Sequence, residues 1–186
     1  DKLMKIIKGD KVKKEVLKYL ITRFTNARNS EIVNAAFDKY YSKLPQDLQS
    51  EKLKNEKLGE LNASVGRVAP DFSWKEDGKD LSLATLNDGE NYLLIFWSTQ
   101  CGHCVNEIPE VHEFMKEFKT TSVIGFAIEE KNSLDFDSWA KNKLYNWHNV
   151  KGTHPEFRFK NETVQTYRIE ATPTYFILDK DKKIVA

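Results

Sequence analysis

The sequence predicts an α/β domain, with a sheet covered by helices on both faces, preceded by a small all-helical domain. Apolar residues recur at helical spacing from about Asp10 to Leu61, and after Gly66 short strand-like runs alternate with helical segments. This change in pattern places the helical domain at residues 1–63 and the α/β domain at residues 64–186. The α/β domain also holds the chain's two cysteines, which lie at a predicted strand-to-helix junction.

The helical domain is predicted from stripes of apolar residues that lie on one face of a helix. Asn29 and Ser30 supply a cap for a second helix, and Pro45 ends it because proline disfavours a helical residue before it. The stripes are Val12, Val16, Leu17, Leu20, Ile21 and Phe24, then Ile32, Val33, Ala36, Phe37, Tyr40, Tyr41 and Leu44, then Leu48, Leu53, Leu58 and Leu61. No residue pattern in this domain indicates a catalytic or binding site.

In the α/β domain, Asp77-Gly78 supplies a turn between two short strands, at residues 72–74 and 81–83. The continuous apolar run at residues 92–97 predicts a central strand buried on both faces. A helix follows Cys104, and further elements are expected along the rest of the chain. These are strands at 122–128, 147–150, 174–178 and 183–185, an amphipathic segment around Phe136, Trp139 and Ala140, and a helix at 161–167.

Composition limits the kinds of partner. The 29 basic and 28 acidic side chains nearly cancel, which gives no electrostatic reason to expect nucleic acid. No apolar run approaches the length of about 20 residues that a membrane helix needs. The chain begins with Asp1 rather than Met, as expected of a processed or trimmed piece from which targeting information has been removed.

Four interpretations of Cys101-Gly102-His103-Cys104 compete. Structural zinc needs four ligands, and no second CxxC or characteristically spaced histidine accompanies this pair, so no metal is expected. Covalent haem attachment needs a histidine directly after the second cysteine, where Val105 stands. Simple packing of two buried cysteines does not explain their position between a strand and a helix. A redox dithiol explains that position best.

A helix that begins near Cys101 directs unpaired N–H groups and the positive end of its dipole at the first sulfur, which favours the thiolate. Cys101 is therefore expected to attack substrate. Cys104, one helical turn later, is expected to resolve the mixed disulfide. His103, when protonated, is expected to stabilise the thiolate further and make the disulfide more oxidising.

Phe96-Trp97 before the CGHC tetrapeptide, with Pro109 five residues after it, resembles thioredoxin. Upstream, Gly66 and the run Ala69-Pro70-Asp71-Phe72 are similar to the opening of the AhpC/TSA and TlpA/ResA-like branch, and Thr172-Pro173-Thr174 matches the family's cis-proline loop. The resemblance implies a thioredoxin-like fold with a central mixed sheet, and thiol–disulfide exchange with protein substrates. It also implies that the chain stops before the family's last helix.

The resemblance assigns roles to single residues. Pro173 matches the cis-proline, and Thr172 the position whose backbone pairs with an extended substrate, so Trp97, Gly102, Thr172 and Pro173 are the expected substrate contacts. Glu107 matches a glutamate that could relay the Cys104 proton, although a first-turn glutamate favoured by the helix dipole explains it nearly as well. No cofactor is expected beyond a Cys101–Cys104 disulfide.

Two departures limit the resemblance. Ile95 stands where thioredoxin has a buried aspartate, and Gln100 replaces the tryptophan before the first cysteine, so proton handling must differ. A peroxidase of the AhpC/TSA type is the alternative enzyme; Ser98 fits its hydroxyl position, but Leu94 stands where its proline belongs. The alternative outside the enzymes is an interaction module that uses the thioredoxin fold.

The expected partners are protein thiols and disulfides and a reducing partner protein. The resemblance implies a place outside the bacterial cytoplasmic membrane, with a tether beyond this chain; a cytoplasmic protein is the alternative. The absence of cysteines outside the pair suits an oxidising compartment, because none can be mispaired. The physiological substrate, the direction of exchange and the oligomeric state are left open.

Overall fold

The computed structural model describes residues 2–26, 29–54, 62–131, 136–138 and 145–186. The chain divides into two compact units, Asp1–Arg67 and Val68–Ala186, so the division lies slightly later than the predicted one after residue 63. Four residues of the predicted apolar stripes lie outside the described part of the chain: Leu58, Leu61, Trp139 and Ala140.

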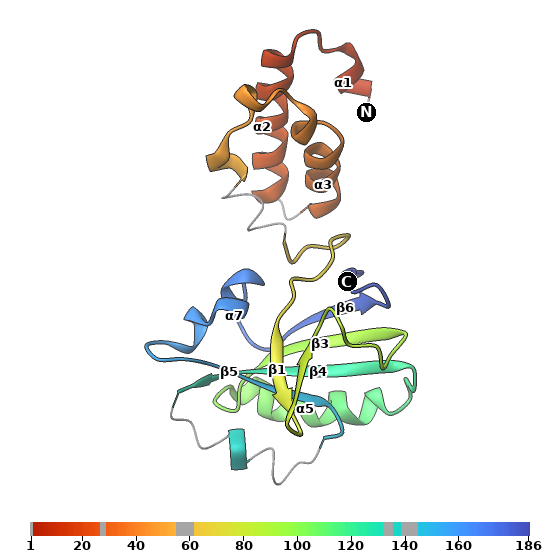
Figure 1. Cartoon of the computed structure of the whole chain (residues 1–186), viewed down its shortest axis with the longest axis vertical. Helices are drawn as coiled ribbons and strands as arrows, with labels where there is room; N and C mark the ends of the chain where they lie inside the picture. Colours follow the sequence, from red (N-terminus) through yellow and green to blue (C-terminus); the bar gives the residue numbers. More distant parts are fainter. Residues whose placement is uncertain (1, 27–28, 55–61, 132–135, 139–144) are drawn as a thin grey trace. The chain divides into compact units, whose positions relative to one another are not determined.

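The first unit is helical, with the elements labelled in Figure 1. Its helices are α1 (Lys2–Ile6), α2 (Asp10–Asn26) and α3 (Ser30–Lys39), followed by the 3₁₀ turns η1 (Tyr41–Lys43) and η2 (Gln46–Leu48) and a helical stretch at residues 51–54. The apolar faces pack into one cluster that includes Leu17, Ile21 and Val33. The Asn29 side chain accepts a hydrogen bond from the Ile32 N–H at 3.2 Å and caps α3, as the sequence predicts.

Two details of the predicted stripes are wrong. The second stripe was expected to continue to Leu44 on one helix, but α3 ends at Lys39 and the chain tightens into η1. Tyr41 is buried there, and its hydroxyl accepts a hydrogen bond from the Ser50 N–H at 2.7 Å, which ties the two segments together. Val12 is 55% exposed, although its spacing predicts the buried face of α2.

The second unit is built on a mixed four-stranded sheet in the order β5-β4-β3-β6. The central strands run parallel to one another, and β6 is antiparallel to β3. The strands are β3 (Asn91–Trp97), β4 (Thr121–Glu130), β5 (His148–His154) and β6 (Thr174–Asp179). A separate hairpin joins β1 (Ser73–Glu76) to β2 (Lys79–Ser82) through Asp77 and Gly78, both at positive φ, as the Asp-Gly turn predicts. The strand expected at residues 183–185 is reduced to isolated bridges at Lys183 and Ile184.

Helices cover both faces of this sheet, which explains the uninterrupted apolar run of β3. Helix α5 (Gly102–Met115) lies along one face, where Ile95 and Trp97 pack with Ile108. Helix α7 (Glu162–Thr166) lies on the other side of the sheet (Figure 1). The core of that side is an aromatic cluster of Phe72, Phe96, Phe126, Tyr167 and Phe176.

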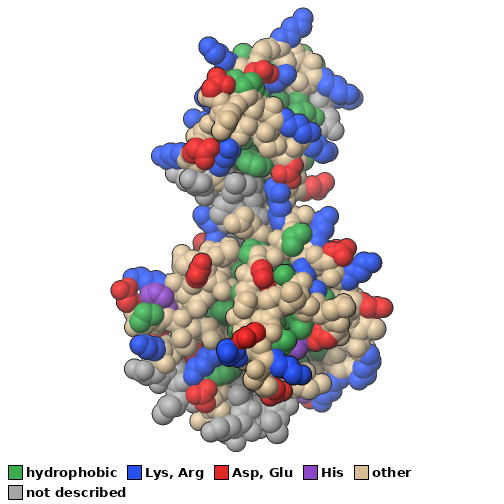
Figure 2. Space-filling model, in the orientation of Figure 1, with side chains coloured by type: hydrophobic (Ala, Val, Ile, Leu, Met, Phe, Trp, Pro, Cys, Tyr) green, Lys and Arg blue, Asp and Glu red, His purple; other side chains and the backbone are tan. Residues whose placement is uncertain are grey.

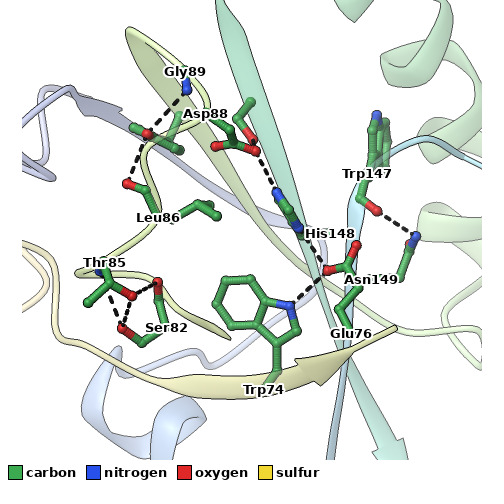
Figure 3. A network of polar contacts seen from close by, with 12 residues as sticks. Trp74, Glu76, Ser82, Thr85, Leu86, Asp88, Gly89, Trp147, His148 and Asn149 are labelled. Carbon is green, nitrogen blue, oxygen red and sulfur yellow. Dashed lines mark hydrogen bonds and ion pairs between the residues drawn. The ribbon is translucent and has the colours of Figure 1, made fainter. Parts of the chain in front are cut away.

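A histidine held between two carboxylates joins the hairpin to the sheet (Figure 3). His148, at the start of β5, places Nδ1 2.7 Å from Glu76 Oε2 on β1 and Nε2 2.7 Å from Asp88 Oδ2. Because both ring nitrogens face a carboxylate, both donate when the ring is protonated. Trp74 Nε1 also donates to Glu76 Oε2 at 2.9 Å, and Ser122 Oγ donates to Asp88 Oδ2 at 3.1 Å. This His148 clamp is not visible in the sequence.

Charges of both signs are interspersed on the face of each unit that Figure 2 displays. This distribution agrees with the near balance of acidic and basic side chains in the chain as a whole. Among the described residues, no helix is long and apolar enough to cross a membrane.

Candidate active site

Cys101 lies at the point where β3 has ended and α5 begins. Its N–H donates to the Ser98 carbonyl at 3.2 Å, and its own extended backbone leads into the helix at Gly102. Its Sγ accepts a hydrogen bond from the Cys104 N–H at 3.4 Å, so the cysteine itself caps the helix. The sulfur therefore stands at the positive end of α5, where a negative charge is stabilised.

The loop before β6 supplies the opposite side of the site. The Thr172–Pro173 peptide bond is cis, as the resemblance predicts. Antiparallel pairing of Phe96 with Thr174 brings the end of β3 beside the start of β6. The Cys101 thiol thereby reaches the Thr172 carbonyl, to which it donates at 3.3 Å, across 71 positions of sequence.

The two cysteines differ in burial and in acidity. Cys101 is partly exposed, whereas Cys104 is 0% exposed; both are free thiols in this structure. Burial of Cys101 opposes its ionisation, but hydrogen bonds from the side chains of Cys104 and Thr172 and from the backbone N–H groups of Cys104 and His103 outweigh it and lower its pKa. Burial, together with the side chain of Cys101, raises the pKa of Cys104 to about 11. The pair thus combines an accessible nucleophile with a thiol that must lose its proton before it reacts.

Three of the predicted site residues lie on the exposed part of α5. Gly102 borders open space, and His103 and Glu107 line a groove of about 560 Å³ along α5. The groove is completed by Asn106, Glu110, Val111 and Phe114. Its lining therefore combines carboxylate and apolar surface.

Trp97, expected to contact substrate, does not reach the surface. Its side chain is 0% exposed and packs in the core with Ile108 and Phe136. The cause is the alternation of β3, which turns Trp97 toward α5. Trp97 therefore belongs to the core against which α5 packs. The substrate contacts that remain from the resemblance are Gly102, Thr172 and Pro173.

Tyr175 is a site residue that the sequence did not reveal. It follows the cis-proline loop on β6, packs against the cluster that contains Cys104, and donates its hydroxyl to Glu107 Oε1 at 2.6 Å. Burial, followed by the charges of Glu107 and Cys104, raises its pKa. The only sequence signal was its place two residues after Pro173.

A buried carboxylate supports the loop that precedes Cys101. Glu129, near the end of β4, is 0% exposed and accepts hydrogen bonds from the Thr99 N–H at 2.6 Å and from Thr99 Oγ1 at 2.9 Å. On the same loop, Arg158 Nη1 donates to Ser98 Oγ and to Gln100 Oε1, each at 2.9 Å. The contacts of Glu129 and Arg158 join residues distant in sequence, and no sequence motif predicts them. They fix the backbone that presents the nucleophile.

The described residues contain no cluster of three or more His, Cys, Asp or Glu side chains suited to a metal ion. The groups that the site brings together are the two thiols and the hydrogen bonds that lower the pKa of Cys101. Fold and site together define the class: a thioredoxin-fold protein with a dithiol opposite a cis-proline.

Comparison with known proteins identifies the family. The AhpC/TSA family model matches residues 65–186, and the chain belongs to that family. The chain is 31% identical over 123 residues to a thiol-disulfide oxidoreductase ResA of Bacillus anthracis, covering 65% of this chain and 67% of the relative. It is 29% identical over 105 residues to a thioredoxin-like protein of Haemophilus influenzae, covering 56% of this chain and 58% of that protein.

Solved structures agree with this assignment. A domain of a possible thiol-disulfide isomerase from Cytophaga hutchinsonii matches with 30% identity and a TM-score of 0.54, over 66% of this chain and 82% of that one. The thioredoxin domain of a thiol-disulfide oxidoreductase from Bacteroides vulgatus has the same fold, with 23% identity and a TM-score of 0.56, over 66% of this chain and 86% of that one. The thioredoxin-like fold expected from the motifs is thereby confirmed.

Proposed function

We propose that this chain is a thiol–disulfide oxidoreductase that exchanges disulfides with protein substrates through Cys101 and Cys104. The observation that carries the proposal is the asymmetry of the pair. Cys101 is accessible, caps α5 and has a lowered pKa, while Cys104 is buried with a raised one. The names of the relatives, which are thiol-disulfide oxidoreductases, support the same activity.

The first chemical step is attack of the Cys101 thiolate on a substrate disulfide. A new S–S bond forms between Cys101 and one substrate sulfur, the substrate S–S bond breaks, and the other substrate sulfur leaves as a thiolate that takes a proton. The Thr172 carbonyl, 3.3 Å from Cys101 Sγ, lies where the backbone of an extended substrate would be held beside the reacting sulfur. The groove along α5 would hold the side chains of that segment.

The second step resolves the mixed disulfide. Cys104 loses its proton, its sulfur attacks Cys101 Sγ, and the bond from Cys101 to the substrate breaks as the Cys101–Cys104 bond forms. Two electrons have then passed from the protein dithiol to the substrate, which leaves with two thiols. A reducing partner protein would return the disulfide to the dithiol, and the same steps in reverse would oxidise a substrate.

The proposed place of action is outside the cytoplasmic membrane of a bacterium. Two observations support it: the resemblance to TlpA/ResA-like proteins, and the absence of any cysteine beyond the pair that an oxidising compartment could mispair. Fractionation of cells that express the native full-length gene tests this location. Recovery of the protein in the cytosol would favour a cytoplasmic reductase.

The activity is tested by insulin reduction, with hydroperoxide consumption measured in parallel by the same reduced protein. We expect insulin reduction by the wild type and none by Cys101→Ser. Cys104→Ser should accumulate a mixed disulfide with substrate, visible by non-reducing electrophoresis, because nothing is left to resolve it.

The alternatives give different outcomes in the same experiment. Rapid hydroperoxide consumption without insulin reduction would indicate the peroxidase, and inactivity in both assays with an intact fold would indicate the interaction module. Faster alkylation of Cys104 than of Cys101 at neutral pH would reverse the assigned roles.

A further inference from the structure

The second step raises a problem of proton transfer. Cys104 is 0% exposed, and burial, with the Cys101 thiol beside it, raises its pKa in the dithiol to about 11, so a nearby base that removes its proton would speed the second step near neutral pH. The preceding strand β3 supplies no such base at Ile95, whose apolar side chain packs in the same cluster as Cys104. Glu107 is the carboxylate on the same face of α5, since side chains three residues apart on a helix are neighbours.

Glu107 by itself is a poor base for this purpose. Its residue is exposed on α5, and a long exposed side chain samples many rotamers. One contact restricts it: Glu107 Oε1 accepts the hydrogen bond of the Tyr175 hydroxyl at 2.6 Å. Tyr175 comes from β6, whose pairing with β3 places it opposite Ile95, and its ring packs against the cluster that holds Cys104 and Ile108.

We propose that Tyr175 is a positioning residue of the exchange reaction, whose hydroxyl holds the Glu107 carboxylate on the Cys104 face of α5 so that it accepts the Cys104 proton. The inference rests on the proposed function and deepens it. Its hydroxyl acts through Glu107. Because burial, Glu107 and Cys104 raise the pKa of Tyr175, its phenol remains a donor throughout the working pH range.

The proton and the electrons balance within the site. The Cys104 S–H bond breaks and its proton moves to the Glu107 carboxylate. The sulfur electron pair forms the bond to Cys101, and the substrate sulfur leaves with the pair of the broken S–S bond. The proton on Glu107 then passes to that substrate thiolate, either directly or through solvent, which restores the carboxylate.

The aromatic disulfide reagent 5,5′-dithiobis(2-nitrobenzoate) tests the two steps separately. Attack by Cys101 releases one coloured thiolate, and attack by Cys104 on the resulting mixed disulfide releases the second, so stopped-flow absorbance resolves both rates. In Tyr175→Phe we expect the second release to slow about tenfold at pH 7, while the first is unchanged. The pH profile of the second release should also move upward, which loss of packing alone would not cause.

The profile is read against the other titratable and charged groups of the described residues around the cysteines. From α5 and its cap these are Cys101, His103, Glu107 and Glu110, from β6 Tyr175, and from the elements that support the preceding loop Glu129 and Arg158. Glu107→Gln should reproduce the slower second release. The double variant should be no slower than Glu107→Gln alone, because the hydroxyl acts only through that carboxylate.

The matched control is Tyr167→Phe. It removes one tyrosine hydroxyl from the same unit, where that hydroxyl donates to the Pro70 carbonyl at 2.6 Å, and it should change neither rate. An unchanged second release and pH profile in Tyr175→Phe would overturn the inference, as would a double variant with additive losses. Absence of either release from the wild type would instead contradict the proposed function, so the two failures are distinct.

Discussion

Replacing His148 with Gln should destabilise the second unit by about 2 kcal/mol. The ring makes two hydrogen bonds of 2.7 Å to the carboxylates of Glu76 and Asp88, and hydrogen bonds to charged groups contribute roughly 1.5–3 kcal/mol each. The glutamine amide can replace only one of them. The His148 side chain is 18% exposed, but that of Asp88 is 43% exposed, so solvent screening reduces the loss to the lower part of the range for one bond.

The loss should depend on pH. Burial alone would lower the pKa of His148, but the hydrogen bonds to Asp88 and Glu76 and their charges outweigh it and raise the pKa. A group with a raised folded-state pKa stabilises the fold fully below its unfolded pKa of about 6.5, and this contribution disappears as the pH rises through the folded value. The difference in stability between wild type and His148→Gln should therefore be largest near pH 6 and shrink toward alkaline pH.

Thermal unfolding followed by circular dichroism between pH 6 and 9 measures this difference. For a unit of this size, about 2 kcal/mol corresponds to a change in Tm of about 8 °C. The control is His154→Gln at the other end of β5, where the ring accepts hydrogen bonds from the backbone N–H groups of Glu156 and Phe157 and forms no ion pair with a carboxylate of the described residues. A difference in Tm between wild type and His148→Gln that stays constant or widens from pH 6 to pH 9 would refute the reasoning.

Two further predictions concern the dithiol and the core. His103→Pro should lower the reduction potential of the cysteine pair by tens of millivolts, where about 30 mV corresponds to roughly 1.4 kcal/mol; equilibration with glutathione measures it, and an unchanged potential would leave His103 as a spacer. Gly152→Ala should cost about 2 kcal/mol of stability, because a Cβ there would meet the Phe126 ring at 2.1 Å. Gly102→Ala, which borders open space, is its control in denaturant unfolding, and equal stability of the two variants would contradict the packing argument.

The sequence predicted best what depends on neighbours in the chain. The apolar run of β3 and the helix start at Cys101 are local features, and both are found where expected, at Asn91–Trp97 and at Gly102. The end of α3 was predicted too late, because the apolar spacing continues past Lys39 whereas the α-helical backbone ends there. Trp97 was misplaced because proximity to the cysteines in sequence does not say which face of β3 a side chain occupies.

The rest of the site depends on strand register, which the sequence alone does not fix. Tyr175 meets Glu107 only because β6 pairs antiparallel with β3, and a shift by one residue would turn its side chain to the other face. Glu129 reaches Thr99 because β4 runs parallel to β3 and extends beyond it. Neither Tyr175 nor Glu129 carries a local sequence signal that predicts the contact it makes.

The pairing of β3 with β6 also sets an order of events during synthesis. Both cysteines leave the ribosome long before Thr172, which stands 71 positions after Cys101. A nascent chain that has reached residue 140 carries the whole CGHC tetrapeptide, yet it has neither the Thr172 carbonyl nor the hydroxyl of Tyr175. The strand that follows the proposed substrate-binding loop, β6, is the last strand of this sheet to be translated. Until then the growing polypeptide has both thiols but lacks the residues proposed to orient a substrate beside them.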